Sequence, residues 1–191
     1  MTILADQNVR VIVQGITGRE AASFTKDMMD YGTRVVAGVT PGKQGHQVHG
    51  VPVYDTVRGA VREHTAETSV ISVPPGMVKG AALEALENGI KLLVVITERV
   101  PRKDVIESLE VAREKGAQVI GPNTLGLISP DVIKLGMAGG PAEDVKKAYM
   151  AGPVGIASRS GGMTTEIANL LTTHGIGPVS YTHLTLPTSC V

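Results

Sequence analysis

The sequence predicts an α/β fold built on a doubly wound parallel sheet. Short apolar runs alternate with segments whose apolar residues recur every three or four positions. The runs are apolar on both faces, as strands covered by helices on both sides are. A regular succession of strand and helix indicates parallel strands joined by right-handed crossovers.

The first part of the chain supplies five strands and four helices. We expect the strands at 9–14, 34–40, 68–73, 91–97 and 118–120. We expect the helices at 19–31, 55–64, 78–88 and 105–116, and we assign Asp55 as the N-cap of the second. Ligands of such folds bind at the carboxyl ends of the strands, so the residues that follow each strand are the candidates for function.

The later part of the chain has a different pattern. Residues 121–152 are rich in Gly and Pro and show no helical period before about Asp144, so we predict a loop, a small hairpin around residues 129–131 and a linker. A strand at 154–157 and a helix at 162–174 follow, with Ile167, Leu170 and Leu171 on the buried face of the helix. These two elements would begin a second α/β domain, which gives boundaries of 1–125, 126–152 and 153–177.

Composition excludes several classes of function. Lys plus Arg and Asp plus Glu are both 18, so the net charge is zero and no basic field favours nucleic acid or an anionic membrane. Aromatic residues are 3 %, which disfavours stacking on single-stranded bases. The one cysteine, Cys190, excludes an internal disulfide and fits a reducing, cytoplasmic compartment. The histidines show no metal-ligand spacing, so we expect no metal site.

The first candidate site is the turn after the first strand. Gly15 and Gly18 bracket Thr17 at the start of a helix, where backbone amides can approach a phosphate. The dinucleotide fingerprint is imperfect, because its third glycine falls at Ala21 and no carboxylate ends the second strand. Lys43, in the following loop, suits a phosphorylated ribose, which CoA and NADP share. A generic turn and a solvated lysine are the alternatives.

Three later segments add candidates at strand ends. Ile96, Thr97 and Glu98 end the fourth strand, and the turn at 121–123 ends the fifth. Ser160 and Gly161 open the last helix, where an anion could bind. The alternatives are a helix cap or solvated acid at Glu98, an ordinary turn at 121–123, and a plain strand-to-helix turn at Ser160.

Taken in order, five short motifs resemble one family. They are QGITG at 14–18, VTPGK at 39–43, ITE at 96–98, GPN at 121–123 and SRSG at 158–161. Together, over about residues 1–177, they resemble the N-terminal part of the α subunit of succinyl-CoA synthetase, also called succinate–CoA ligase. The resemblance implies a Rossmann-like CoA-binding domain at 1–125 and the truncated start of a ligase domain at 153–177.

The resemblance also implies roles for individual residues. The positions matching the family's CoA contacts are Thr17, Gly18, Arg19, Glu20, Lys43, Ile96, Thr97 and Glu98. Ser160 and Gly161 match a helix N-terminus that stabilises the phosphate of a phosphohistidine. Thr165 occupies the position of a substrate-contacting tyrosine. Thr124 and Leu125 replace a Cys-Pro pair, and these last two departures leave the acid substrate open.

The family reaction joins a carboxylate to CoA at the expense of ATP or GTP, in the tricarboxylic acid cycle for succinate. The resemblance implies a β subunit as partner, which holds the nucleotide with Mg, and a small-molecule carboxylate as substrate. None of the five histidines matches the phosphohistidine, so we expect no catalytic residue in this chain and no turnover by it alone. The alternatives are an NADP-dependent oxidoreductase and a non-catalytic domain that senses CoA or a nucleotide.

The last residues have a distinct origin in our interpretation. Residues 179–188, VSYTHLTLPT, fit one reading frame of a DNA sequence that resembles a transposase adapter used in sequencing libraries, and a genuine divergent C-terminus is the alternative. We therefore expect residues 178–191 to be a non-native tail and set them aside from the prediction of the fold.

Overall fold

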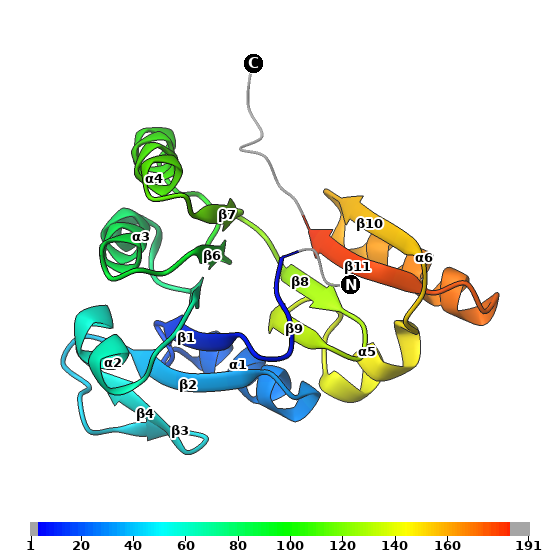
Figure 1. Ribbon diagram of the computed structural model, residues 1–191, viewed down its shortest axis with the longest axis horizontal. Helices are drawn as coiled ribbons and strands as arrows, with labels where there is room; N and C mark the ends of the chain where they lie inside the picture. Colours follow the sequence, from blue (N-terminus) through cyan, green and yellow to red (C-terminus); the bar gives the residue numbers. More distant parts are fainter. Residues whose placement is uncertain (1–3, 184–191) are drawn as a thin grey trace.

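The chain forms two sheets, and the computed structural model describes residues 4–183 (Figure 1). The first sheet has seven strands in the order β3-β4-β2-β1-β5-β6-β7. The second has four strands in the order β10-β11-β8-β9. In the first sheet every pair is parallel except β3 with β4, so the predicted doubly wound parallel sheet is confirmed.

The elements of the first sheet follow the predicted alternation. The strands are β1 (Arg10–Gln14), β2 (Arg34–Val39), β3 (Gln47–Val48), β4 (Val51–Tyr54), β5 (Thr68–Ile71), β6 (Leu92–Val95) and β7 (Gln118–Ile120). The helices are α1 (Arg19–Tyr31), α2 (Val57–Glu63), the 3-10 turn η1 (Pro75–Met77), α3 (Val78–Glu87) and α4 (Arg102–Glu114).

Two local predictions need correction at the edge next to β2. Strands β3 and β4 were not predicted, because β3 is two residues long and Pro52 interrupts β4, as is typical near the edge of a sheet. The N-cap of α2 is Thr56 and not Asp55: the Thr56 side chain accepts from the Gly59 amide at 3.0 Å. Asp55 instead accepts from the backbone amides of the loop before β3.

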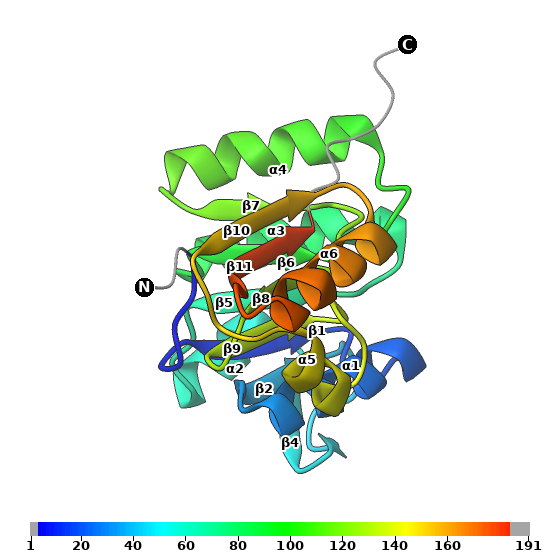
Figure 2. The ribbon, with the colours of Figure 1, turned by 90° about the vertical axis from the view of Figure 1, so that its right-hand side faces the viewer.

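Two layers cover the first sheet. Helices α2, α3 and α4 lie on one face and enclose an apolar cluster that includes Ile12, Ile71 and Leu93. Helix α1 and the β8–β9 hairpin lie on the other face, and their cluster includes Phe24 and Leu135 (Figure 1). Figure 2 shows the second sheet in front of the first, with α5 (Ala142–Ala148) and α6 (Gly161–Thr173) outermost.

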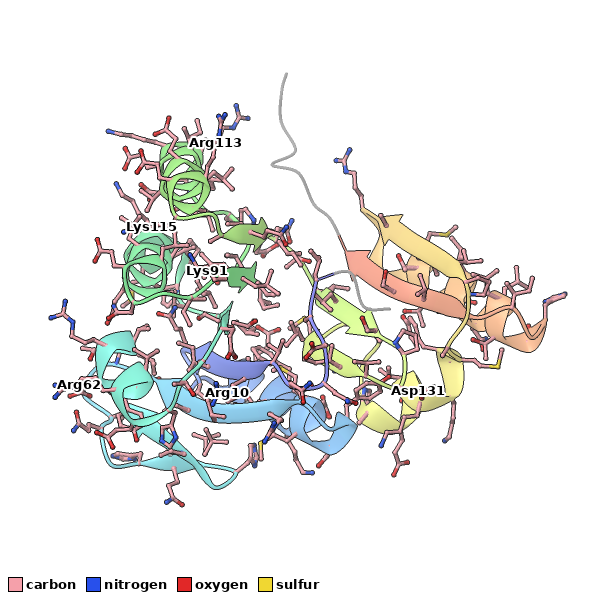
Figure 3. All side chains as sticks on the ribbon, in the orientation of Figure 1. Arg10, Arg62, Lys91, Arg113, Lys115 and Asp131 are labelled. Atoms are coloured by element: carbon pink, nitrogen blue, oxygen red, sulfur yellow. The ribbon has the colours of Figure 1, made fainter. Side chains whose placement is uncertain are left out.

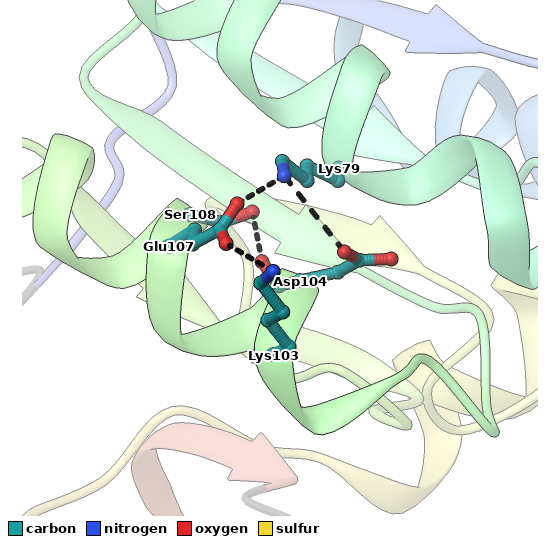
Figure 4. A network of polar contacts seen from close by, with 5 residues as sticks. All are labelled: Lys79, Lys103, Asp104, Glu107 and Ser108. Atoms are coloured by element: carbon teal, nitrogen blue, oxygen red, sulfur yellow. Dashed lines mark hydrogen bonds and ion pairs between the residues drawn. The ribbon is translucent and has the colours of Figure 1, made fainter.

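Polar contacts tie the elements together at both edges of the first sheet. At the carboxyl edge, the Lys79 ammonium pairs with Glu107 and lies 3.9 Å from Asp104, which joins α3 to α4 (Figure 4). The hydrogen bond raises the pKa of Lys79 and lowers that of Glu107. At the opposite edge, Lys91 Nζ donates to the Lys115 carbonyl at 2.6 Å, and Figure 3 shows both residues.

The second sheet joins segments that are far apart in the sequence. Its strands are β8 (Gly126–Ser129), β9 (Ile133–Gly136), β10 (Val154–Ser158) and β11 (Pro178–His183). The predicted hairpin is confirmed, and the Val132 amide closes its turn on the Ser129 carbonyl at 3.0 Å. Strand β11 lies between β10 and β8 and connects the hairpin to the later strand.

Part of the segment that we set aside is thus a strand. Residues 178–183 pair with two neighbours, although pairing of the backbone does not reveal the origin of the sequence. The non-native tail therefore stays a prediction. Residues 184–191, including Cys190, lie outside the described residues.

Helix α6 turns a different face to the core from the one predicted. Thr164 and Ala168 are buried, whereas Ile167 and Leu170 are 39 % and 59 % exposed. Leu171 is half-buried. Two stripes satisfy the same helical spacing, and the sequence favours the one with larger apolar residues. The structure uses the smaller residues, which allow α6 to pack closely on Tyr149 and Ile156.

Candidate functional site

A cavity of about 630 Å³ opens at the carboxyl edge of the first sheet. It is lined by the loops after β1, β5, β6 and β7, by the start of α1, and by Met137, which follows β9. The lining residues are Gly18, Arg19, Glu20, Ala21, Ser72, Val73, Pro74, Pro75, Ile96, Thr97, Glu98, Arg99, Asn123, Thr124, Leu125 and Met137. The cavity is therefore where the fold class predicts a ligand.

The turn after β1 requires glycine because it approaches the next loop closely. Gly15 has φ +81°, and a Cβ built on it would lie 2.0 Å from the Ser72 carbonyl oxygen. Its own amide donates to the Val39 carbonyl at 2.7 Å. The loops after β1, β2 and β5 are thus held together at the edge of the cavity.

The first helix presents an uncapped N-terminus to the cavity. Gly18 is the N-cap of α1 and offers no side-chain hydrogen bond. The first residues of the helix, Arg19, Glu20 and Ala21, line the cavity. The first amides of a helix have no partner within the helix, and the helix dipole makes this end positive. Such an end can hold a phosphate.

The loop after β6 is anchored on both sides. The Thr97 hydroxyl donates to the Val73 carbonyl at 2.7 Å. The Asn123 amide donates to the Thr97 carbonyl at 2.9 Å. Ile96 is buried, and Glu98 is exposed. Six of the eight predicted CoA contacts therefore meet around one cavity: three come from the start of α1 and three from the segment after β6.

The other two predicted contacts lie beside the first turn and do not line the cavity. The Thr17 and Thr40 hydroxyl oxygens are 3.3 Å apart. Asp55 Oδ1 accepts from the amides of Lys43 and Gln44, at 3.0 Å each, which fixes the loop that carries Lys43. The Lys43 side chain is exposed.

The residues predicted for a second anion site lie next to the cavity wall. Ser160 caps α6, and its hydroxyl oxygen accepts from the Met163 amide at 3.4 Å. A Cβ on Gly161 would lie 2.2 Å from Leu125 Cδ1, so the start of α6 packs against a residue that lines the cavity.

Thr165 is not brought to the cavity. Its hydroxyl lies 3.2 Å from that of Tyr149, in the apolar cluster beneath α6. Burial raises the pKa of Tyr149. Thr165 therefore contacts the core of the second sheet, and its predicted role toward substrate stays a prediction.

Sequence reasoning missed one wall of the cavity. Ser72, Val73, Pro74 and Pro75 follow β5, which lies between β1 and β6 in the sheet. The sequence did carry a signal for this wall. The segment follows the third predicted strand, whose carboxyl end lies at the same edge of the sheet, and it contains two consecutive prolines. Met137 was also missed, since it comes from the loop after β9 and no local pattern brings it there.

Within residues 4–183, no group of three or more His, Cys, Asp or Glu side chains could hold a metal ion. Over the same residues, no helix is both long and apolar enough to cross a membrane.

Comparison with known proteins agrees with this geometry. The family described as "CoA binding domain" matches residues 6–99. Residues 6–99 are therefore similar to a CoA-binding domain. The matched segment contains the first turn, the Lys43 loop and Ile96–Glu98.

Curated relatives extend the similarity beyond the CoA-binding domain. A succinate–CoA ligase [ADP-forming] α subunit of Archaeoglobus fulgidus is 48 % identical over 177 residues, which is 93 % of this chain and 60 % of the relative. An ADP-forming sulfoacetate–CoA ligase subunit of an Acholeplasma species is 42 % identical over 93 % of this chain and 59 % of the relative. The resemblance to succinate–CoA ligase α subunits is thus confirmed, and the chain spans about three fifths of their length.

A solved structure has a similar arrangement of both sheets. ATP citrate lyase from Methanothrix soehngenii, in complex with citrate and coenzyme A, superposes with a TM-score of 0.84 at 26 % identity. The superposition covers 94 % of this chain and 32 % of that chain. The second sheet is therefore part of the shared fold, and the CoA-binding domain does not stand alone in it.

Proposed function

We propose that the chain is the CoA-binding part of the α subunit of an acid–thiol ligase, which forms an acyl-CoA from a carboxylate. The observation that carries the proposal is the uncapped N-terminus of α1, which opens on the cavity between the strand ends. Its amides would hold the diphosphate of CoA. The apolar side chains of Val73, Ile96 and Met137 would contact the less polar parts of the ligand.

The residues around the cavity fit CoA better than a nicotinamide dinucleotide. Strand β2 ends at Val39, and the next residue is Thr40, whose hydroxyl donates to the Val39 carbonyl at 2.8 Å. No carboxylate stands there to accept from the free hydroxyls of an NAD ribose. Lys43, in the following loop, supplies a cation that suits a ribose phosphate.

NADP-dependent oxidoreduction remains the second candidate, and Lys43 is the observation that favours it. Both candidates are tested by calorimetric titration of the chain with CoA, NADP and NAD. We expect CoA to bind most tightly. Tighter binding of NADP than of CoA would refute the proposal in favour of the oxidoreductase.

The Lys43 prediction is tested in the same titration. Lys43→Ala should weaken CoA binding by about 1–2 kcal/mol, the scale of one charge-assisted contact. It should weaken dephospho-CoA binding less, because that ligand lacks the ribose phosphate. Lys43→Arg, which keeps the charge, is the matched control. Equal losses for the two ligands in Lys43→Ala would reject a contact to the ribose phosphate.

The acid substrate and the partner belong to the whole protein and are proposed by analogy. Relatives act on succinate or sulfoacetate by name, and both acids carry two anionic groups. We propose succinate as the acid, a β subunit that binds ATP or GTP with Mg as the partner, and the cytoplasm as the compartment. The phosphate of a phosphohistidine would rest at Ser160 and Gly161. None of the five histidines of this chain matches the phosphohistidine. Incubation with a β subunit and labelled ATP should therefore leave this chain without acid-labile label.

A further inference from the structure

Arg99 has a backbone conformation that its side chain does not favour. Its φ is +58°, in the left-handed region. Among the described residues, the other non-glycine residues with positive φ are His49, Asn123 and Asp131. Asn and Asp tolerate this region because their short polar side chains can bond to the local backbone, whereas Arg gains nothing comparable.

Two of these four residues line the cavity, namely Arg99 and Asn123. Strained residues persist only where their surroundings hold them, and they cluster at binding sites. Thr97 is held two residues earlier by its bonds to Val73 and Asn123. Pro101 begins α4 two residues later as its N-cap. Arg99 must therefore turn the chain within a short segment fixed at both ends.

The guanidinium of Arg99 is available to a ligand at the cavity. The side chain is 85 % exposed, and its Nε lies 3.6 Å from Oε1 of the adjacent Glu98. An exposed ion pair of this kind contributes little, so a phosphate can replace Glu98 as the partner at small cost. Arg also matches phosphate geometry with two parallel hydrogen bonds, which glycine at this turn could not supply.

We propose that Arg99 binds a phosphate group of CoA from the β6 side of the cavity, opposite Lys43 on the β2 side. This inference rests on the proposed function. Arg19 at the start of α1 and Arg99 in the loop after β6 then bring two cations to one ligand. The phosphate is either in the diphosphate or on the ribose, and dephospho-CoA distinguishes the two.

The test compares variants that separate charge from backbone strain. Arg99→Gly and Arg99→Asn both remove the charge and relieve the strain, while Arg99→Lys keeps a charge. Arg113→Gln, on the exposed surface of α4, is the control for a general loss of positive charge. Each variant is titrated with CoA and dephospho-CoA by calorimetry, and its melting temperature is measured without ligand.

We expect Arg99→Gly and Arg99→Asn to weaken CoA binding about 5- to 20-fold, as loss of one charge-assisted contact does. Arg99→Lys should lose less, and Arg113→Gln should bind as the wild type does. Both uncharged variants should melt higher, because a strained residue has been replaced by one that tolerates positive φ. Loss of stability together with loss of binding would contradict the proposed strain.

The ligand series assigns the phosphate. An equal loss for CoA and dephospho-CoA supports contact with the diphosphate, and a loss confined to CoA supports contact with the ribose phosphate. Unchanged affinity for both ligands, with a higher melting temperature, would overturn the inference: Arg99 would then be a turn residue only. In that case wild-type binding of CoA would still support the proposed function, whereas a wild type that binds no CoA would overturn both.

Discussion

Gly15→Ala should destabilise the chain more than an alanine at a left-handed glycine whose added Cβ would meet no other atom. Gly15 has φ +81°, and the added Cβ would lie 2.0 Å from the Ser72 carbonyl oxygen and 3.1 Å from Val73 Cγ1. Both obstacles belong to the loop after β5, and the nearer one is backbone. The methyl group can fit only if the loops after β1 and β5 move apart by about 1.5–2 Å, the gap between 2.0 Å and an ordinary contact.

The magnitude follows from two contributions. A left-handed conformation costs an L-residue about 1–2 kcal/mol. Overpacking against a well-held backbone adds about 1–3 kcal/mol. We therefore expect the free energy of unfolding to fall by about 3 kcal/mol, which for a chain of this size lowers the melting temperature by about 6–12 °C.

Gly89→Ala is the matched control. Gly89 has φ +88°, nearly that of Gly15, but its added Cβ would meet no atom within 4 Å. Only the backbone contribution of about 1–2 kcal/mol applies to it. Urea unfolding of the wild type and both variants, followed by circular dichroism, measures the difference. Equal losses in the two variants would refute the steric argument, and unchanged CoA affinity in a folded Gly15→Ala protein would refute the coupling of this turn to the cavity.

Two further predictions concern other parts of the molecule. Burial lowers the pKa of Lys134 from 10.5 to about 8, so between pH 8 and 10.5 the unfolded chain binds more protons and stability from this group rises with pH. Lys134→Met should therefore raise the free energy of unfolding by about 3 kcal/mol at pH 7. The difference in stability between this variant and the wild type, measured by urea titration, should shrink toward pH 10. A difference that does not change with pH would contradict this. In hydrogen exchange, the amides of β10 and α6 should exchange at least about tenfold faster than those of β1. The reason is that four residues of β1 are buried and no residue of β10 is. Equal protection of these elements would contradict the prediction.

The sequence by itself determined the strand and helix alternation and the place of the ligand. Apolar periodicity depends on neighbours a few positions away, so it located α1 and β7 at their observed bounds. Parallel strands bring their carboxyl ends to one edge, and this rule alone brought Gly18 and Thr97 to one cavity. The ordered short motifs indicated the family from the sequence alone.

Only the tertiary structure decided the features that depend on contacts between distant segments. It selected the small-residue stripe of α6, since both stripes have the same helical period and only packing distinguishes them. Strand β11 joined β10 to the hairpin, although a six-residue strand gives no sign of its neighbours. Contacts between distant segments also decided three further features. They are the Ser72–Pro75 wall of the cavity, the left-handed backbone of Arg99 and the full burial of Lys134. Burial and strain are set by what surrounds a residue in space, and local sequence patterns do not encode those surroundings.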